Sequence, residues 1–284
     1  MEKRNIKWTT AATIGAFSFI LTACSSGPVS ISLPALAHTN AKTHGQVIWR
    51  DLATTAPEKV KPFYHNVFGW DYQTVSDDYS LITYQGNYIA GIAKMPANNS
   101  TNYWMPVIST NDIDLTLLKS EQAGGKTLLG NTNLKGRGEF AVIQDPQGAV
   151  FSVLNTVSGD PKALPKLNGS WMWQEVWSED TVKSHNFYQK LGHFTYNTKK
   201  FGSHEYPYLS ISDQPSFGFV QKPNSEVPTT WANYIKVADV DATVAKVKQN
   251  GGDVLMMPTA KVRNGTVAII RDPAGAGLVI QEMK

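Results

Sequence analysis

The sequence contains nearly the same pattern twice, about 125 residues apart. The first copy consists of Phe63-Tyr64, Asp112-Ile113-Asp114, Gly124-Gly125 and Asp145-Pro146-Gln147-Gly148. The second copy consists of Phe187-Tyr188, Asp239-Val240-Asp241, Gly251-Gly252 and Asp272-Pro273-Ala274-Gly275. The aromatic pairs lie 124 residues apart, and the other three motifs lie 127 residues apart. Shared order and near-constant spacing predict two structurally equivalent halves.

The N-terminus has the pattern of a targeting segment. Three basic residues precede an uncharged, largely apolar run, residues 11–21, that is too short for an ordinary transmembrane helix. The run ends in Leu21-Thr22-Ala23-Cys24, which resembles a bacterial lipobox. The resemblance implies a lipoprotein signal peptide over residues 1–23 and lipidation of Cys24, the only cysteine in the chain. The alternative is an ordinary secretory signal that happens to contain a cysteine.

Lipidation would place the protein in the bacterial cell envelope, attached to the membrane through Cys24. No Asp follows the cysteine, so the resemblance implies the outer membrane if the host is Gram-negative. Residues 24–44 contain Ser, Pro, Thr, Asn and Gly with few strong apolar patterns, and we expect a tether there. The net charge of the chain is +3, and no basic cluster indicates a nucleic-acid partner.

Each half divides again into two similar units. In each unit an opening strand precedes an amphipathic helix, and further strands follow the helix. Asp112 is a good N-cap for the second helix, and Gly69 is positioned to end the first. We therefore predict an α+β protein with a first domain over residues 45–156, a linker over 157–169 and a second domain over 170–284.

The order of these motifs resembles the vicinal-oxygen-chelate superfamily, which includes glyoxalase I, bleomycin-resistance proteins and extradiol dioxygenases. Trp49-Arg50-Asp51-Leu52 and Trp173-Gln174-Glu175-Val176 are similar to a tandem-domain branch of that superfamily. The resemblance covers about residues 45–283. It implies two glyoxalase-like domains, each built from two βαβββ units with curved mixed sheets that enclose a cavity.

Metal enzymes of this superfamily hold a divalent ion with His, Gln or Glu side chains from the sheets. The resemblance puts Arg50 and Gln174 at the first ligand position, and Ser152 and Val279 at the last. Arginine only donates hydrogen bonds, whereas Gln174 could coordinate through its amide oxygen. A mononuclear site needs three or four convergent ligands. We therefore predict no cofactor, with Gln174 as a weak metal candidate and a divalent metal as the alternative.

Two carboxylates occupy equivalent positions on the opening strands, Asp51 and Glu175. Strand alternation groups their neighbours on one face: Trp49 with Asp51, and Trp173 and Trp177 with Glu175. If that face lines a cavity, these five residues form ligand sites, and the two carboxylates are candidate acid-base groups. The alternative, which we favour, is that both carboxylates are strand-end groups paired with Arg50 or with backbone donors.

Other charged and aromatic residues fit either a pocket or an ordinary surface and core. Arg137, Glu139 and Arg263 lie in loops that border the cavity in relatives; Arg263 could hold an anion or be a solvated loop charge, which we favour. Further aromatic residues could line a pocket or belong to the core: Tyr84, Trp104, Tyr208, Trp231 and Tyr234.

Two functions remain compatible with the sequence. The favoured one is a lipid-anchored, metal-free module that binds a small molecule in an aromatic cavity. The alternative is a lyase, dioxygenase or hydrolase of the same superfamily that uses a non-standard metal site or Asp51 and Glu175 as acid-base groups. Self-association into a homo-oligomer stays open.

Overall fold

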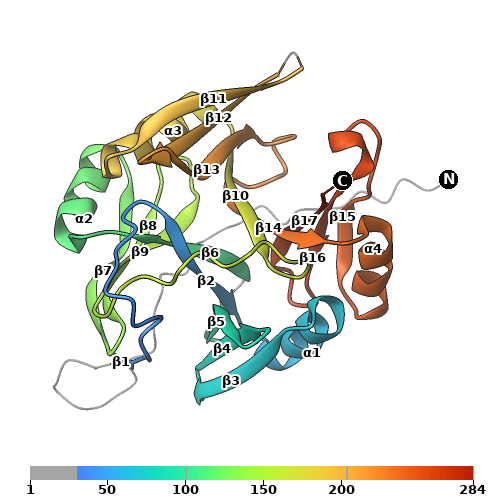
Figure 1. The fold of residues 1–284 in the computed structure, drawn as a ribbon, viewed down its shortest axis with the longest axis horizontal. Helices are drawn as coiled ribbons and strands as arrows, with labels where there is room; N and C mark the ends of the chain where they lie inside the picture. Colours follow the sequence, from blue (N-terminus) through green and yellow to red (C-terminus); the bar gives the residue numbers. More distant parts are fainter. Residues whose placement is uncertain (1–30, 100, 203, 284) are drawn as a thin grey trace.

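The computed structural model describes residues 31–99, 101–202 and 204–283. Within these residues the chain forms two large mixed β-sheets, one from each half, with helices packed between them (Figure 1). Helix α1 lies beside α4, and α2 lies beside α3, so each helix pair joins the two halves. The described helices are α1 (Pro57–Phe68), α2 (Ile113–Gln122), α3 (Thr181–Leu191), α4 (Val240–Gln249) and the short 3-10 turn η1 (Arg263–Gly265).

The first sheet places the opening strands of its two units side by side at the centre. Its order is β1 (Ile31–Ser32), β7 (Lys126–Lys135), β8 (Gly138–Gln144), β9 (Val150–Thr156), β6 (Tyr103–Ser109), β2 (Val47–Thr54), β5 (Asn87–Lys94), β4 (Tyr79–Tyr84) and β3 (Asp71–Ser76). Strands β2 and β6 run antiparallel, and each also pairs in parallel with the last strand of its own unit.

The second sheet repeats this arrangement. Its order is β11 (Thr195–Phe201), β12 (His204–Ile211), β13 (Gln214–Gln221), β10 (Trp171–Ser178), β14 (Thr230–Val237), β17 (Gly277–Glu282), β16 (Val267–Arg271) and β15 (Asp253–Met256). Helix α2 begins at its predicted N-cap, Asp112. The carboxylates of three aspartates accept from backbone N–H groups in the first turn of their helices: Asp112 in α2, Asp180 in α3 and Asp239 in α4. Gly69 ends α1 in the left-handed conformation. The α+β class and the βαβββ units are confirmed.

The repeated motifs fasten the two halves to each other. Tyr64 of α1 donates to Asp272 in the Asp-Pro-Ala-Gly turn of the other half at 2.9 Å, and Trp104 donates to the Tyr64 hydroxyl at 2.8 Å. The reciprocal bonds run from Tyr188 to Asp145 at 3.1 Å and from Trp231 to Tyr188 at 3.1 Å. Two of the buried apolar clusters therefore contain residues of both halves.

The tether predicted over residues 24–44 is wrong for its described part, residues 31–44. Strand β1 pairs in parallel with β7, and the side chains of Leu33 and Leu36 are buried. Thr43 donates to the carboxylate of the buried Asp160 from its backbone N–H at 2.6 Å. A Ser- and Pro-rich composition concealed two leucines that have a sheet face to cover. The signal peptide and Cys24 lie outside the described residues.

None of the helices in the described part of the chain is long and apolar enough to cross a membrane.

Candidate ligand-binding site

Strand alternation gives each sheet one face toward the helices and one face without helices, which we call the helix-free face. Trp49 and Asp51 of β2 lie on the helix-free face of the first sheet, within an apolar cluster that contains no helix residue. Trp173 lies on the same face of the second sheet, in a cluster that also lacks helix residues. The predicted grouping of these side chains is therefore what the geometry shows.

Arg50 and Gln174 point the other way, into the interface between the two sheets. Arg50 donates to the Asn233 amide oxygen at 2.9 Å and to the Gln174 amide oxygen, and its guanidinium lies 4.8 Å from the Trp171 ring centre. Gln174 in turn donates to the backbone oxygen of Ser216. These two side chains join the halves and do not face a cavity.

In the second half, four donors surround the fully buried carboxylate of Glu175. The Tyr206 hydroxyl and the Arg263 guanidinium donate to Oε1 at 2.8 and 2.9 Å. Trp177 donates to Oε2 at 2.9 Å, and the Tyr234 hydroxyl does so at 2.5 Å. Burial and the nearby carboxylate raise the pKa of both tyrosines, so their hydroxyls stay protonated as donors. With four hydrogen bonds, Glu175 fixes its neighbours.

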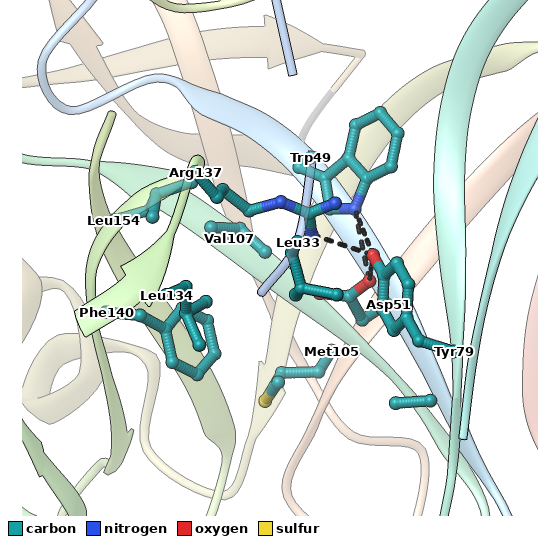
Figure 2. Close-up of a pocket in the computed structure, with 11 residues that line it drawn as sticks. Leu33, Trp49, Asp51, Tyr79, Met105, Val107, Leu134, Arg137, Phe140 and Leu154 are labelled. Atoms are coloured by element: carbon teal, nitrogen blue, oxygen red, sulfur yellow. Dashed lines mark hydrogen bonds between the residues drawn. The ribbon is translucent and has the colours of Figure 1, made fainter. Parts of the chain in front are cut away.

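The first half carries a smaller version of the same arrangement, shown in Figure 2. Asp51 accepts from Tyr79 at 2.7 Å and from Trp49 at 3.1 Å, through the same oxygen. Arg137 donates to the Tyr79 hydroxyl at 2.8 Å. Burial raises the pKa of Asp51, and the charge of Arg137 and the two hydrogen bonds oppose that shift.

The two arrangements occupy equivalent places in the two halves. In each, a carboxylate and a tryptophan come from the opening strand, a tyrosine comes from β4 or β12, and an arginine comes from the loop before β8 or β16. A glycine on the neighbouring strand makes room for the tyrosine. A Cβ at Gly91 would lie 2.0 Å from the Tyr79 hydroxyl oxygen, and one at Gly218 would lie 1.9 Å from that of Tyr206. A larger residue at either position therefore requires the tyrosine to shift.

The two helix-free faces differ in what lies above these groups. In the first half, Leu33 joins the lining of a cavity of about 20 Å³, which is room for roughly one water molecule. Arg137 is only 3% exposed, and its Nη2 is buried without a hydrogen-bond partner among the described residues. In the second half, Trp173, Trp177 and Tyr206 are half-buried, and 38% of the Arg263 side chain is exposed.

The residues present do not fit a superfamily-type metal site. Asp51 and Glu175 each lie beside an arginine, whose positive charge takes the place that a cation would occupy. The amide oxygen of Gln174, the weak metal candidate, already accepts from Arg50. Within the described residues no group of three His, Cys, Asp or Glu side chains could hold an ion. The second half holds a carboxylate–arginine ion pair, and in the first half Tyr79 links Arg137 to Asp51 through its hydroxyl.

Several sequence expectations need correction here. Asp51 and Glu175 do not pair with Arg50 or backbone donors as strand-end groups, and Arg263 is not a solvated loop charge. Trp104 and Trp231 belong to the core between the halves, whereas Tyr234 contributes to the Glu175 site. The sequence analysis missed two tyrosines, Tyr79 and Tyr206. Their signal was available, since both lie at the same offset of 127 residues as the repeated motifs.

Comparison with known proteins agrees with this geometry. Residues 174–280 match the family model described as the Glyoxalase/Bleomycin resistance protein/Dioxygenase superfamily. The second half of the chain is therefore similar to this superfamily. It is 29% identical over 241 residues to "Putative glyoxylase CFP32" of Mycobacterium bovis, covering 80% of this chain and 91% of that protein. It is also 29% identical over 265 residues to the anthracycline biosynthesis protein DauV of a Streptomyces species, covering 84% and 94%.

Solved structures share the fold at low sequence identity. A Mn(II)-bound glyoxalase from Novosphingobium aromaticivorans superposes with a TM-score of 0.59 and 13% identity, covering 84% of this chain and 82% of that one. A 2,2',3-trihydroxybiphenyl 1,2-dioxygenase from Sphingomonas wittichii superposes with a TM-score of 0.57 and 14% identity, covering 85% and 91%. These similarities establish the tandem fold alone.

Proposed function

We propose that the protein is a lipid-anchored binding protein of the bacterial envelope that holds a planar, anionic small molecule on the helix-free face of its second sheet. The observation that carries this proposal is the pairing of half-buried indoles with a partly exposed arginine. Trp173 and Trp177 offer flat apolar surface, and Arg263 offers charge. Aromatic walls with a few fixed polar groups are typical of small-molecule sites.

Arg263 is held ready for an anion. It donates to Glu175 at 2.9 Å and to Gln281 at 2.7 Å, which uses two of the five N–H donors of a guanidinium. Its guanidinium carbon lies 5.2 Å from the Tyr234 ring centre, so the group is fixed by packing as well as by hydrogen bonds. A ligand carboxylate, sulfonate or phenolate can accept from the remaining donors while its ring lies against Trp173 or Trp177.

Glu175 serves this site by positioning its neighbours. All of its hydrogen bonds go to side chains that form the site, and the carboxylate is fully buried. A ligand would meet Tyr206, Trp177 and Arg263 first. In this proposal no metal takes part, and the Cys24 lipid supplies the membrane attachment.

Catalysis by the same site is the second candidate. The names of relatives favour it, since they include a putative glyoxylase and anthracycline biosynthesis proteins, and structural neighbours include a glyoxalase and dioxygenases. Such an enzyme would need Asp51 or Glu175 as an acid-base group, or a metal held by non-standard ligands. Stoichiometric divalent metal in protein purified without chelator would favour the enzyme over the binding protein.

The binding proposal is tested with anilinonaphthalene sulfonate, an aromatic anion whose fluorescence rises in apolar sites. We expect saturable binding that Arg263→Met weakens about tenfold, because the anion loses its charged partner. The matched control is Arg137→Met, which removes the equivalent arginine beneath Leu33 and should leave this affinity unchanged. Equal affinity of the wild type and Arg263→Met, by equilibrium dialysis, would contradict the proposed site.

A further inference from the structure

The N-terminal segment occupies the place above Asp51 and Arg137 that a ligand would occupy above Glu175 and Arg263. Leu33 packs into the apolar cluster of the helix-free face, and Arg137 Nε donates to the backbone oxygen of Pro34 at 3.1 Å. Figure 2 shows Leu33 beside Trp49 and Asp51, with the Arg137 guanidinium close by. A backbone carbonyl thus takes one donor of the arginine, as an anionic group of a ligand would.

The closed site retains an unsatisfied binding group. Arg137 Nη2 is buried and has no hydrogen-bond partner among the described residues, although the side chain lines the remaining cavity. An orphaned guanidinium donor inside a protein is costly, and it points to a second state in which the group is satisfied. The donor type and its aromatic neighbours, Trp49 and Tyr79, match those of the second half.

From these observations we infer that residues 31–36 are a displaceable plug that closes a second ligand site, built on Arg137, Tyr79 and Trp49. The chemical class of ligand is the same planar anion, and in this respect the inference rests on the proposed function. When the plug leaves, Arg137 loses the Pro34 carbonyl and gains the ligand anion. The protein then has two equivalent sites, one open and one gated by its own chain.

The contacts of the N-terminal segment favour release of residues 31–36 alone. Residues 31–36 are held by the two-residue strand β1, by Leu33 and Leu36, and by Arg137. Two leucines must offset the entropy of ordering the whole plug.

The following residues are fixed more firmly, through Asp160. The carboxylate of Asp160 accepts from Ser109 at 2.7 Å and from Thr156 at 2.8 Å, and its backbone oxygen accepts from Thr39 at 2.8 Å. The backbone oxygen of Ala37 also accepts from the Ser158 hydroxyl at 2.6 Å, so the hinge lies between Leu36 and Ala37.

The sheet is shaped to admit the plug closely. Gly136 has φ of 91°, and a Cβ there would lie 2.7 Å from the backbone oxygen of Leu33. Any side chain at this position would push the plug outward. The turn before β8 thus both carries Arg137 and leaves the space for the segment that covers it.

The first test removes the apolar hold of the plug. Leu33→Ser/Leu36→Ser should bind one more anilinonaphthalene sulfonate per chain than the wild type, by equilibrium dialysis. The matched control is Leu164→Ser/Leu167→Ser, which changes two exposed leucines of the linker and should add no site. Adding Arg137→Met to the plug variant should abolish the extra site. No extra site in a plug variant with a native near-ultraviolet circular dichroism spectrum would overturn the inference.

The second test needs no substitution and no ligand. The amide of Leu33, bonded to Lys135 O at 3.0 Å, should exchange its hydrogen faster than the amides of Asn40 and Thr43, because the plug opens without the rest of the segment. Equal protection of the three amides would overturn the inference even if the wild type binds the dye. Conversely, a wild type that binds no dye would defeat the proposed function, while faster exchange of Leu33 would still support the plug.

Discussion

The helix-free faces of the two sheets carry the same carboxylate, tyrosine, tryptophan and arginine, yet one is part of the core and the other is a surface. In the first half Tyr79 is 7% exposed and Arg137 is 3% exposed. In the second half 38% of the Arg263 side chain is exposed. The arginine, tyrosine and tryptophan side chains are therefore buried in the first half and partly exposed in the second. What separates the two faces is residues 31–36, a segment that covers the first face and has no counterpart over the second among the described residues.

The opposite faces keep the two Tyr–Asp joints alike, although Arg50 and Gln174 differ there at equivalent positions. The bonds from Tyr64 to Asp272 and from Tyr188 to Asp145 are reciprocal, and each tyrosine also accepts from a tryptophan of its own half. Both halves therefore meet the same packing requirement where they join.

The largest effect should come from breaking the symmetric interface. Trp104→Ala and Trp231→Ala each remove a buried indole, and we expect each to lower the free energy of unfolding by about 3–5 kcal/mol. The two losses should be similar, since the two indoles pack at equivalent joints. Urea denaturation followed by near-ultraviolet circular dichroism measures them, and both variants should unfold in a single transition because the cores contain both halves.

A variant that unfolded in two separate transitions would show that the halves are independent, contrary to the shared clusters. Trp173→Ala is the matched control for indole removal, because its ring is only half-buried and lies away from the joint. It should cost less than either core substitution and should reduce ligand affinity instead.

A smaller loss of stability should distinguish the helix-free face of the first sheet from that of the second. A Cβ at Gly91 would lie 2.0 Å from the Tyr79 oxygen and 2.2 Å from Asp51, in a closed core. A Cβ at Gly218 would meet the Tyr206 oxygen at 1.9 Å, but Tyr206 can move outward. We expect Gly91→Ala to cost roughly 2–3 kcal/mol of stability and Gly218→Ala about 1 kcal/mol.

The two variants should rank in the opposite order when their effect on dye affinity is compared. Gly218→Ala displaces Tyr206 and should weaken dye binding, whereas Gly91→Ala should not change the affinity of the open site. Thermal unfolding and equilibrium dialysis on the same preparations give both quantities. Equal stability losses would mean that the first face is no better packed than the second.

The sequence predicts those parts of the fold that leave a repeated spacing or an alternation of apolar residues. The repeat, the N-caps and the grouping of Trp49 with Asp51 follow from spacing and alternation, and the structure bears them out. Periodicity did not reveal strands β3, β7, β11 and β15, three of which are sheet edges and all of which have few buried residues. Such strands bury too little apolar surface to leave a period-two pattern.

The site was predictable only in part for a physical reason. Residue types on one strand can be assigned to a face, but a partner on another strand or loop depends on register and curvature. Asp51 and Glu175 were therefore found, while their links to Arg137 and Arg263 were not. The plug was hidden for the same reason. Leu33 and Leu36 become meaningful only once a sheet face without a covering helix is known to lie beneath them.

The smallest effect we predict concerns the pH dependence of stability. It tests whether the two Tyr–Asp joints, which have the same geometry, are also electrostatically equivalent. Burial raises the pKa of Asp145 and of Asp272, although hydrogen bonds from backbone and tyrosine oppose the shift. The folded state then keeps its proton to higher pH than the unfolded state does. The stability that each group contributes is full below the ordinary pKa of 3.8 and is lost as pH rises through the folded pKa.

Asp145→Asn and Asp272→Asn cannot titrate, so each variant should show a flatter fall in unfolding free energy from pH 4 toward neutrality, measured by urea denaturation across that range. The two slopes should change by the same small amount, and a change in only one of them would show that the two joints differ electrostatically.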